Sequence, residues 1–412
     1  MNYQAIRNDL YGAMRKEGIF TWDYMYEQEY ALAGVKKVSR EIFVELAEAT
    51  ERLGGVFQRA VEVLSQADDE LLLGLGIPEC ALRAVRVRVL EGLPTAIGRF
   101  DFAQTTEGMK MLELNSDTPT GIVEAYHVNG RVCSYYGLQD PNEGMRVHIA
   151  DAFRQVVEAY RRQGYPTERV YFSSLDWHEE DAATTRYLLA QSGLSGEFVA
   201  LSDLRVYEDR LHVWENGEHK PVDLLYRLHA LEKLAEDRDT DGYETGAHVL
   251  DLIARRRLGI INPPSAFLAQ TKALQAVIWS LHESGAFFEP EEQEAIERFM
   301  LPTYLENRFE GTGIPYVSKP ILGREGGGVT LYNDKGELWE RDGEEFYWEQ
   351  PMVYQKAVEL PEWTVDTING PYRGRLLWGS FWMGGRASAV VARIGERITG
   401  NLSCYLPVAV AE

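Results

Sequence analysis

Residues 316–333 read YVSKPILGREGGGVTLYN, two apolar strand-like segments joined by a turn that contains four glycines. The first segment predicts a strand carrying Lys319 to the turn, where glycine lets the backbone approach a ligand closely and aim its amides at an anion. Lys319 offers a point charge to phosphate, and Arg324 can bind two oxygens at once. Because a strand follows the glycines, the stretch matches neither GxxxxGK[ST] nor the helix-opening GxGxxG pattern. It predicts a hairpin over nucleotide phosphates, or else a plain hairpin turn.

The chain that follows this stretch is rich in strands. Glycine turns separate the apolar segments YVSKPIL, GVTLYN, PMVYQKAV, GRLLWGSFWM and SAVVARI. This alternation is typical of an antiparallel sheet with tight hairpins. The segment YQKAV, residues 354–358, precedes a break at Leu360 and Pro361. It is either a hinge strand whose backbone reads adenine or an ordinary half-buried strand.

Two polar triplets upstream flank the turn-like TTEG, namely RFD at 99–101 and ELN at 113–115. The first and third residues of a strand triplet point to the same side. If strands over 95–102 and 109–115 pair across the turn, Asp101, Glu113 and Asn115 converge as three oxygen donors. Such hard oxygen ligands suit Mg²⁺. The same pattern also fits a solvated hairpin face with an Arg–carboxylate pair.

The polar segment SDTPTG, residues 116–121, cannot readily continue the second strand. It supplies hydroxyls and backbone N–H groups that could hold a carboxylate substrate. Lys272, in the segment NPPSAFLAQTK, lies near the start of a predicted helix. An ordinary surface lysine is the alternative interpretation there.

Helical periodicity covers much of the remaining sequence. Apolar residues recur at helical spacing over 40–66 and 77–90, and further helices are predicted over 145–163, 247–257 and 266–281.

Residues 169–230 are expected to form a small α/β unit with parallel strands. Its predicted strands cover 170–175, 196–202 and 222–228, with a helix over 179–191.

Acidic residues outnumber basic ones by 64 to 42, which gives a formal net charge of −22. Such a surface repels phosphate backbones and anionic membranes, so we expect no nucleic-acid or membrane partner. There is no uncharged apolar run of about 18 residues and no signal-peptide pattern. Cys80, Cys133 and Cys404 are scattered and lack zinc spacing. We expect reduced thiols in a cytoplasmic protein.

Over nearly the whole chain, the sequence resembles the synthetase domain of glutathionylspermidine synthases. The matching segments are RFD at 99–101, ELNSDTPTG at 113–121, the Lys272 helix, KPILGREG at 319–326, YQKAVELP at 354–361 and Arg393. The resemblance implies an ATP-grasp fold of mixed α+β and α/β class, with interleaved lobes, an antiparallel sheet carrying the glycine loop, and a small α/β lobe. We expect one domain over 1–412, with approximate lobes 1–160, 165–260 and 261–412. Nothing corresponds to the N-terminal cysteine amidase of bifunctional relatives.

The resemblance also implies roles for individual residues. Arg99 would stabilise the transferring phosphoryl group, while Asp101, Glu113 and Asn115 would bind two Mg²⁺ ions, with Glu113 bridging. The residues implied to contact ATP are Lys272, Lys319, Gly323, Arg324, Glu325, Gly326, Gly327, Gln355, Lys356, Ala357, Val358 and Arg393.

Thr118 and Thr120 occupy the places of two serines near the thiol-peptide substrate of the family. Glu232 falls where an acidic residue contacts substrate, but its surroundings, YRLHALEKL, lack the tryptophans of the family. The partner of Glu232 and the identity of the amine therefore stay open.

The reaction that this resemblance implies converts a carboxylate and ATP into an acyl phosphate, which an amine then attacks to give an amide, ADP and phosphate. A glycine loop that excludes water would protect the acyl phosphate. The expected substrates are a peptide-like carboxylate, such as glutathione, and a polyamine or other amine. One alternative is a peptide ligase that joins amino acids or peptides, and another is a nucleotide-binding protein without turnover.

Overall fold

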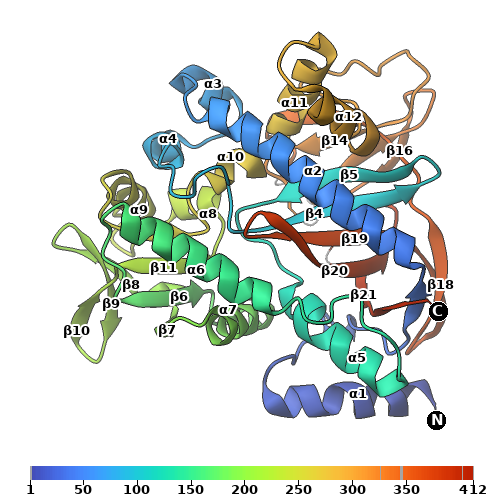
Figure 1. The fold of residues 1–412 in the computed structure, drawn as a ribbon, viewed down its shortest axis with the longest axis horizontal. Helices are drawn as coiled ribbons and strands as arrows, with labels where there is room; N and C mark the ends of the chain where they lie inside the picture. Colours follow the sequence, from blue (N-terminus) through green and yellow to red (C-terminus); the bar gives the residue numbers. More distant parts are fainter. Residues whose placement is uncertain (1, 325, 344–346, 401, 412) are drawn as a thin grey trace.

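The strands that carry Arg99 and Glu113 pair with the last part of the chain in a six-stranded antiparallel sheet (Figure 1). The computed structural model describes residues 2–324, 326–343, 347–400 and 402–411. The strand order is β21-β20-β19-β4-β5, and β18 pairs with β19. Its strands are β4 (Ile97–Thr105), β5 (Gly108–Asn115), β18 (Glu362–Thr367), β19 (Gly370–Met383), β20 (Arg386–Gly395) and β21 (Cys404–Leu406). The two strands predicted around TTEG are confirmed and pair with each other.

The long helix α2 (Arg40–Leu64) lies along one face of this sheet and confirms the helix predicted over 40–66 (Figure 1). Its close approach depends on Gly54, because a Cβ atom at that position would lie 2.6 Å from the Trp382 ring on β19. The opposite face packs on a second apolar cluster that includes Phe381 and Val391. Adjacent residues Phe381 and Trp382 therefore enter different cores, as strand alternation requires.

A second antiparallel sheet has the order β13-β17-β14-β15-β16. Its strands are β13 (Thr303–Tyr304), β14 (Tyr316–Pro320), β15 (Thr330–Tyr332), β16 (Leu338–Arg341) and β17 (Met352–Lys356). The prediction of one C-terminal antiparallel sheet was wrong in this respect, since β18 to β21 leave this sheet and join β4 and β5. Residues 376–383 are nearly all buried, as expected of a strand paired on both edges inside a sheet.

The small α/β unit is confirmed, with the parallel strand order β12-β11-β6-β7. These strands are β6 (Val170–Ser174), β7 (Gly196–Ala200), β11 (Leu224–Leu228) and β12 (Gly259–Ile261). A small antiparallel sheet of β8 (Leu204–Tyr207), β9 (Arg210–Glu215) and β10 (Glu218–Pro221) extends from it (Figure 1). Two further strand pairs are β1–β2 (Tyr24–Met25 with Gln28–Glu29) and β3–β22 (Lys36–Val38 with Val408–Val410).

The remaining helices surround these sheets, and none in the described residues has the length and apolar character needed to cross a bilayer. The α-helices are α1 (Tyr3–Glu17), α3 (Asp69–Gly74), α4 (Leu82–Val85), α5 (Asn129–Tyr136), α6 (Val147–Arg162), α7 (Glu179–Ser192), α8 (Leu231–Glu236), α9 (Thr245–Ala254), α10 (Ala266–Gln270), α11 (Lys272–Ser284) and α12 (Pro290–Phe299). The short turns of other helix types are η1 (Glu79–Ala81), the π-helix η2 (Glu124–Val128) and η3 (Leu201–Asp203).

Two helix predictions need correction. The helix predicted over 77–90 is reduced to η1 and α4, because Val85 packs in one core whereas Val87 and Val89 pack in the other. A single helix face cannot serve two cores in this way. The helix predicted over 266–281 breaks at Thr271, whose hydroxyl accepts a hydrogen bond from the backbone N–H of Ala273 at 3.3 Å and starts α11.

Candidate functional site

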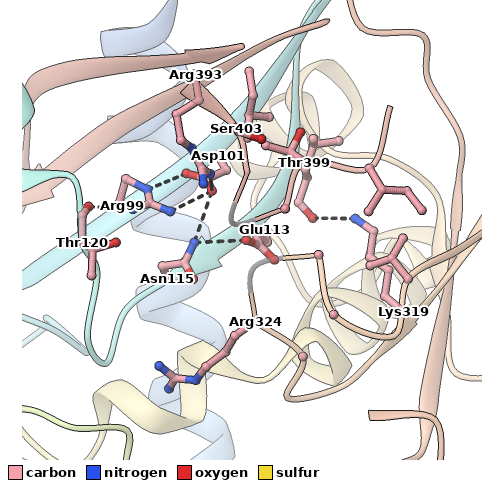
Figure 2. Close-up of a pocket in the computed structure, with 18 of the residues that line it drawn as sticks. Arg99, Asp101, Glu113, Asn115, Thr120, Lys319, Arg324, Arg393, Thr399 and Ser403 are labelled. Atoms are coloured by element: carbon pink, nitrogen blue, oxygen red, sulfur yellow. Dashed lines mark hydrogen bonds and ion pairs between the residues drawn. The ribbon is translucent and has the colours of Figure 1, made fainter. Parts of the chain in front are cut away.

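A cavity of about 240 Å³ lies where β4, β5 and β20 face β14 and β17. Most of the predicted site residues line it: Arg99, Asp101, Glu113, Asn115, Thr118, Thr120, Lys272, Lys319, Gly323, Arg324, Gly326, Gly327, Gln355, Lys356, Val358 and Arg393. Figure 2 shows Arg99, Asp101, Asn115 and Glu113 in one connected series, with Lys319 across the cavity. The sequence motifs, far apart along the chain, thus meet at one place.

Asp101, Glu113 and Asn115 converge as predicted, with the help of a register shift between Asp101 and Phe102 that the spacing did not indicate. Asp101 pairs with Glu113, and Arg99 with Asn115, in the β4–β5 register. The Asn115 amide nitrogen lies 3.4 Å from Asp101 Oδ2 and 3.2 Å from Glu113 Oε1. The alternative of a solvated hairpin face is wrong, because Asp101 is only 1% exposed and Arg99 7%, although the Arg–carboxylate pair of that alternative is present between these two residues.

Two arginines hold the Asp101 carboxylate. Arg99 binds it through Nε at 2.7 Å and Nη2 at 2.9 Å, and Arg393 on β20 binds it at 3.0 Å (Figure 2). Arg99 also donates to the Thr120 carbonyl at 2.6 Å. Burial would lower the pKa of Arg99, but the Asp101 carboxylate raises it above its ordinary value, so the guanidinium stays charged.

Two lysines surround the Glu113 carboxylate. Lys272 Nζ lies 3.0 Å from Glu113 Oε2, and it is 5% exposed, so the surface-lysine interpretation is wrong. Burial would raise the pKa of Glu113, but the charges of Lys272 and Lys319 lower it to about 2. Burial lowers the pKa of Lys319 itself to about 8. Both lysines therefore lie where an anion in the cavity would meet them.

The glycine loop is held against the cavity from two sides. Lys272 Nζ donates to the Gly323 carbonyl at 2.7 Å. Arg324 binds Glu232 through Nε at 2.9 Å and Nη2 at 3.4 Å, and Thr118 Oγ1 through Nη1 at 3.1 Å. Glu232 is absent from the described cavity lining and lies behind Arg324. Glu325 lies outside the described residues.

The strand that pairs with β14 beside Lys319 is β17, the predicted adenine strand. The side chain of Gln355 is 2% exposed and its Oε1 accepts from Lys319 Nζ at 2.7 Å. Gln355 thereby positions Lys319, a role that the sequence did not suggest. Lys356 and Val358 line the cavity, whereas Ala357 is not among its lining residues and donates its backbone N–H to the Pro315 carbonyl at 2.9 Å.

In the segment 116–121, Thr118 and Thr120 line the cavity, as the sequence suggested. The first two backbone amides of the segment are already bonded, because Ser116 and Asp117 donate to Gln270 Oε1 at 2.9 and 3.0 Å. Those two N–H groups are therefore not available to a substrate carboxylate.

Several residues that line the cavity were missed by the sequence argument. They are Met25, Tyr26, Tyr30, Glu180, Arg397, Thr399 and Ser403, among others. Tyr30 and Glu180 lie in segments without glycine or repeated polar spacing, so no local pattern marks them. Gly400 follows Thr399 and was the available signal for a loop near a ligand.

The chemistry of the donor set decides whether a divalent cation fits. In the described residues no three His, Cys, Asp or Glu side chains form a metal-binding group, and the proposed trio has only two carboxylates. Rotation of the Asn115 side-chain amide, whose nitrogen now faces the two carboxylates, would bring its Oδ1 into position as the third oxygen ligand. The positive charges of Arg99, Arg393 and Lys272 already neutralise the carboxylates of Asp101 and Glu113. The trio therefore fits a metal cation that enters together with an anionic ligand, which supplies further negative charge.

A family model described as "Glutathionylspermidine synthase preATP-grasp" matches residues 1–411. The chain belongs to this family. The three relatives described in the next paragraph are named as ligases or synthetases. The expectation that this chain belongs to a family of ligases is therefore confirmed.

Three relatives illustrate the similarity. A Haemophilus influenzae protein described as an acid–amine ligase is 27% identical over 76% of this chain and 74% of its own length. The trypanothione synthetase of Crithidia fasciculata is 26% identical over 71% of this chain. The bifunctional glutathionylspermidine synthetase/amidase of Escherichia coli is 23% identical over 81% of this chain. The matches cover only 45% and 55% of the latter two proteins.

Among solved structures, a glutathione synthetase-like effector, GSS30 from Globodera pallida, superimposes with a TM-score of 0.57 at 14% identity. The match covers 100% of this chain and 98% of that one. This chain and the glutathione synthetase-like effector therefore share a mixed α/β fold.

Proposed function

We propose that this member of the glutathionylspermidine synthase family is an ATP-dependent carboxylate–amine ligase of the ATP-grasp type that works through an acyl phosphate. The observation that carries the proposal is the convergence of Asp101, Glu113 and Asn115 in a cavity that a glycine loop borders. The cationic side chains that line this cavity include Arg99, Lys272, Lys319 and Arg393. Transfer of the γ-phosphoryl group of ATP needs positive charge around the phosphoryl oxygens and oxygen ligands for Mg²⁺. The proposed lobes remain 1–160, 165–260 and 261–412, with one sheet joining the first and the last.

The proposed roles follow from position in the cavity. Lys272, Lys319 and the glycine loop hold the ATP phosphates, and residues 355–358 border the base. Asp101, Glu113 and Asn115 would hold two Mg²⁺ ions, which neutralise charge on the transferring phosphate. Arg99 would contact the transferring phosphoryl group.

Thr118 and Thr120 border the place proposed for the carboxylate substrate, beside Arg99. Glutathione or another peptide is the proposed acid, and a polyamine or other amine the proposed nucleophile. The presence of the acidic side chain of Glu180 in the cavity lining favours a cationic amine over an amino acid.

The test is a screen for ADP release with purified protein and MgATP. Carboxylates such as glutathione and dipeptides are paired with spermidine or with amino acids, and products are weighed by mass spectrometry. An amide formed together with ADP supports the proposal. ATP binding without ADP release for any pair would contradict it and favour a nucleotide-binding protein without turnover.

The pKa of Lys319 predicts pH-dependent nucleotide binding. A bound phosphate favours the charged lysine, so binding takes up a proton where free Lys319 is neutral, above about pH 8. The affinity for the nucleotide is therefore highest below about pH 8 and falls as the pH rises through this value. The Kd of a non-hydrolysable ATP analogue should be about tenfold weaker at pH 9 than at pH 7.

Calorimetry in buffers of different ionisation enthalpy measures both the Kd and the proton uptake. Lys319→Arg is the control, since its guanidinium keeps its charge and should flatten the profile. A wild-type Kd that is constant across this pH range would show that Lys319 does not contact phosphate.

The ion pair between Glu232 and Arg324 predicts an effect on ATP rather than on the amine. Glu232→Gln removes the charge that holds Arg324 over the cavity, and the pair is partly exposed. We expect about a fivefold higher KM for ATP, corresponding to about 1 kcal/mol. Hydrogen exchange should also become faster at residues 323–328.

Glu236→Gln is the matched control on the same helix, because Glu236 pairs with Lys233 on the surface. A rise in KM for the amine, with KM for ATP unchanged, would instead assign Glu232 to amine binding.

A further inference from the structure

A carboxylate that the proposed mechanism does not yet use is buried beside the cavity. Glu124 is 0% exposed and lies three residues after the segment 116–121, at the start of the π-helix η2. Its Oε1 accepts hydrogen bonds from Trp22 Nε1 at 2.9 Å and from the Tyr30 hydroxyl at 3.0 Å. Its Oε2 is buried and has no hydrogen-bond partner among the described residues. A buried carboxylate with an unsatisfied oxygen is costly, and π-helical turns are frequent at functional sites.

Tyr30 connects this carboxylate to the cavity. Tyr30 lines the cavity together with Arg99, Thr120 and Gly121, while its hydroxyl donates to Glu124. Tyr30 therefore borders both the cavity beside Arg99 and the buried Glu124 carboxylate.

The charged groups around this pair come from several elements. Glu180 on α7 and Arg393 on β20 act on Tyr30, and Arg99 on β4 acts on Glu124. The Tyr405 hydroxyl donates to the Glu124 backbone carbonyl at 3.3 Å. Burial raises the pKa of Glu124, which brings it closer to neutral pH, where a proton acceptor works best.

Two other acids of the cavity, both in the proposed metal-binding trio, are less suited to accept a proton. Asp101 is held by two arginines, and Glu113 has a pKa lowered to about 2. An amine substrate, however, is protonated near neutral pH and has no lone pair for attack until it loses a proton. The reaction therefore needs a proton acceptor that the metal-binding trio does not supply.

Resting on the proposed ligase function, we propose that Tyr30 and Glu124 form a proton relay that activates the amine, with Tyr30 facing the substrate and Glu124 acting through it. One N–H bond of the ammonium breaks and its proton bonds to the Tyr30 oxygen, while the original Tyr30 proton moves to Glu124 Oε1. The freed lone pair attacks the acyl carbon, and the C–O bond to phosphate breaks. The second N–H proton leaves with the departing phosphate.

The test compares two nucleophiles with glutathione as the acid. Spermidine is protonated at neutral pH and needs the relay, whereas hydroxylamine is largely uncharged and traps the acyl phosphate as a hydroxamate without it. Tyr30→Phe should lower kcat with spermidine by about 10²–10³-fold and leave hydroxamate formation within about twofold of wild type. Glu124→Gln should show the same selectivity, since the amide keeps an acceptor for Trp22 and Tyr30 but takes up no proton.

Tyr24→Phe is the matched control from the strand β1, a few residues before Tyr30, because Tyr24 is 50% exposed and its hydroxyl donates locally to the Glu27 carbonyl. Melting temperatures identify a variant that fails to fold, and Tyr30→Phe, which keeps the ring, decides the question if Glu124→Gln does not fold. Equal losses with both nucleophiles, or a selective loss in Glu180→Gln but not in Tyr30→Phe, would overturn the relay. If the wild-type protein forms neither the amide nor the hydroxamate with glutathione or any other carboxylate, both the ligase function and the relay are overturned. If the wild-type protein forms the hydroxamate, the ligase function stands independently of the relay.

Discussion

Replacing Arg99 with alanine should lower kcat by about 10²–10³-fold while leaving ATP affinity within a few-fold of wild type. Arg99 is buried, and its guanidinium is fixed by Asp101 and the Thr120 carbonyl. Such a preorganised charge stabilises a transferring phosphoryl group without having to reorganise during the reaction. Because the contact is expected mainly in the transition state, the loss should appear in kcat rather than in ground-state binding.

Single-turnover ADP formation and calorimetry with a non-hydrolysable ATP analogue separate these two effects. Arg99→Lys should recover only part of the rate, since an ammonium cannot bind Asp101 and phosphate with two prongs. Some loss of thermal stability is expected in Arg99→Ala, but Arg393 and Asn115 still contact Asp101 and limit it. Full activity in Arg99→Ala would remove Arg99 from the mechanism.

Asp117→Asn should cost about 3–5 kcal/mol of the free energy of unfolding. Asp117 and Arg227 form an ion pair at 2.5 Å with side chains that are 0% and 1% exposed. The asparagine keeps the shape but leaves the Arg227 charge buried without a counter-charge. Asp117 Oδ2 also accepts from the Leu231 N–H at 2.9 Å and so anchors α8, which carries Glu232. We therefore expect a higher KM for ATP as well.

Urea denaturation and thermal melting measure this effect. Asp251→Asn is the matched control, because Asp251 pairs with Arg83 and Arg255 on the surface and should barely change either transition. A small effect in Asp117→Asn, equal to that of the control, would show that water or neighbouring dipoles solvate Arg227.

The parts of the fold that follow from local pattern were predictable. Apolar periodicity identified α2, and two strand-like segments on either side of the turn-like TTEG identified the β4–β5 hairpin. The turn alone would place Asp101 opposite Leu112, and a register shift between Asp101 and Phe102 brings Glu113 opposite Asp101 instead. The convergence of the trio depends on this irregularity, which the sequence pattern did not indicate. The pairing of β19 with β4 could not be predicted, because nothing in either strand specifies its partner.

The candidate site likewise has a part that the sequence reveals and a part that it does not. Lys319 and the glycines lie in one continuous segment, which the sequence displays directly. The partners of these residues are distant in sequence: Gln355 binds Lys319, and Glu232 binds Arg324. Glu124 lies within the apolar stretch GIVEAYHV, where a lone carboxylate is unusual, and that was the signal available for it.

The pairing of Ile97 on β4 with Met383 on β19 has a consequence for how the protein is made. One edge of the β4–β5 hairpin stays open until the chain has been synthesised through β19, on the order of 15–60 s at synthesis rates of 5–20 residues per second. An unpaired edge of this kind is a template for wrong association, so the nascent chain should depend on chaperones during this interval. Chains that terminate before residue 383 should be degraded or aggregate rather than retain partial function.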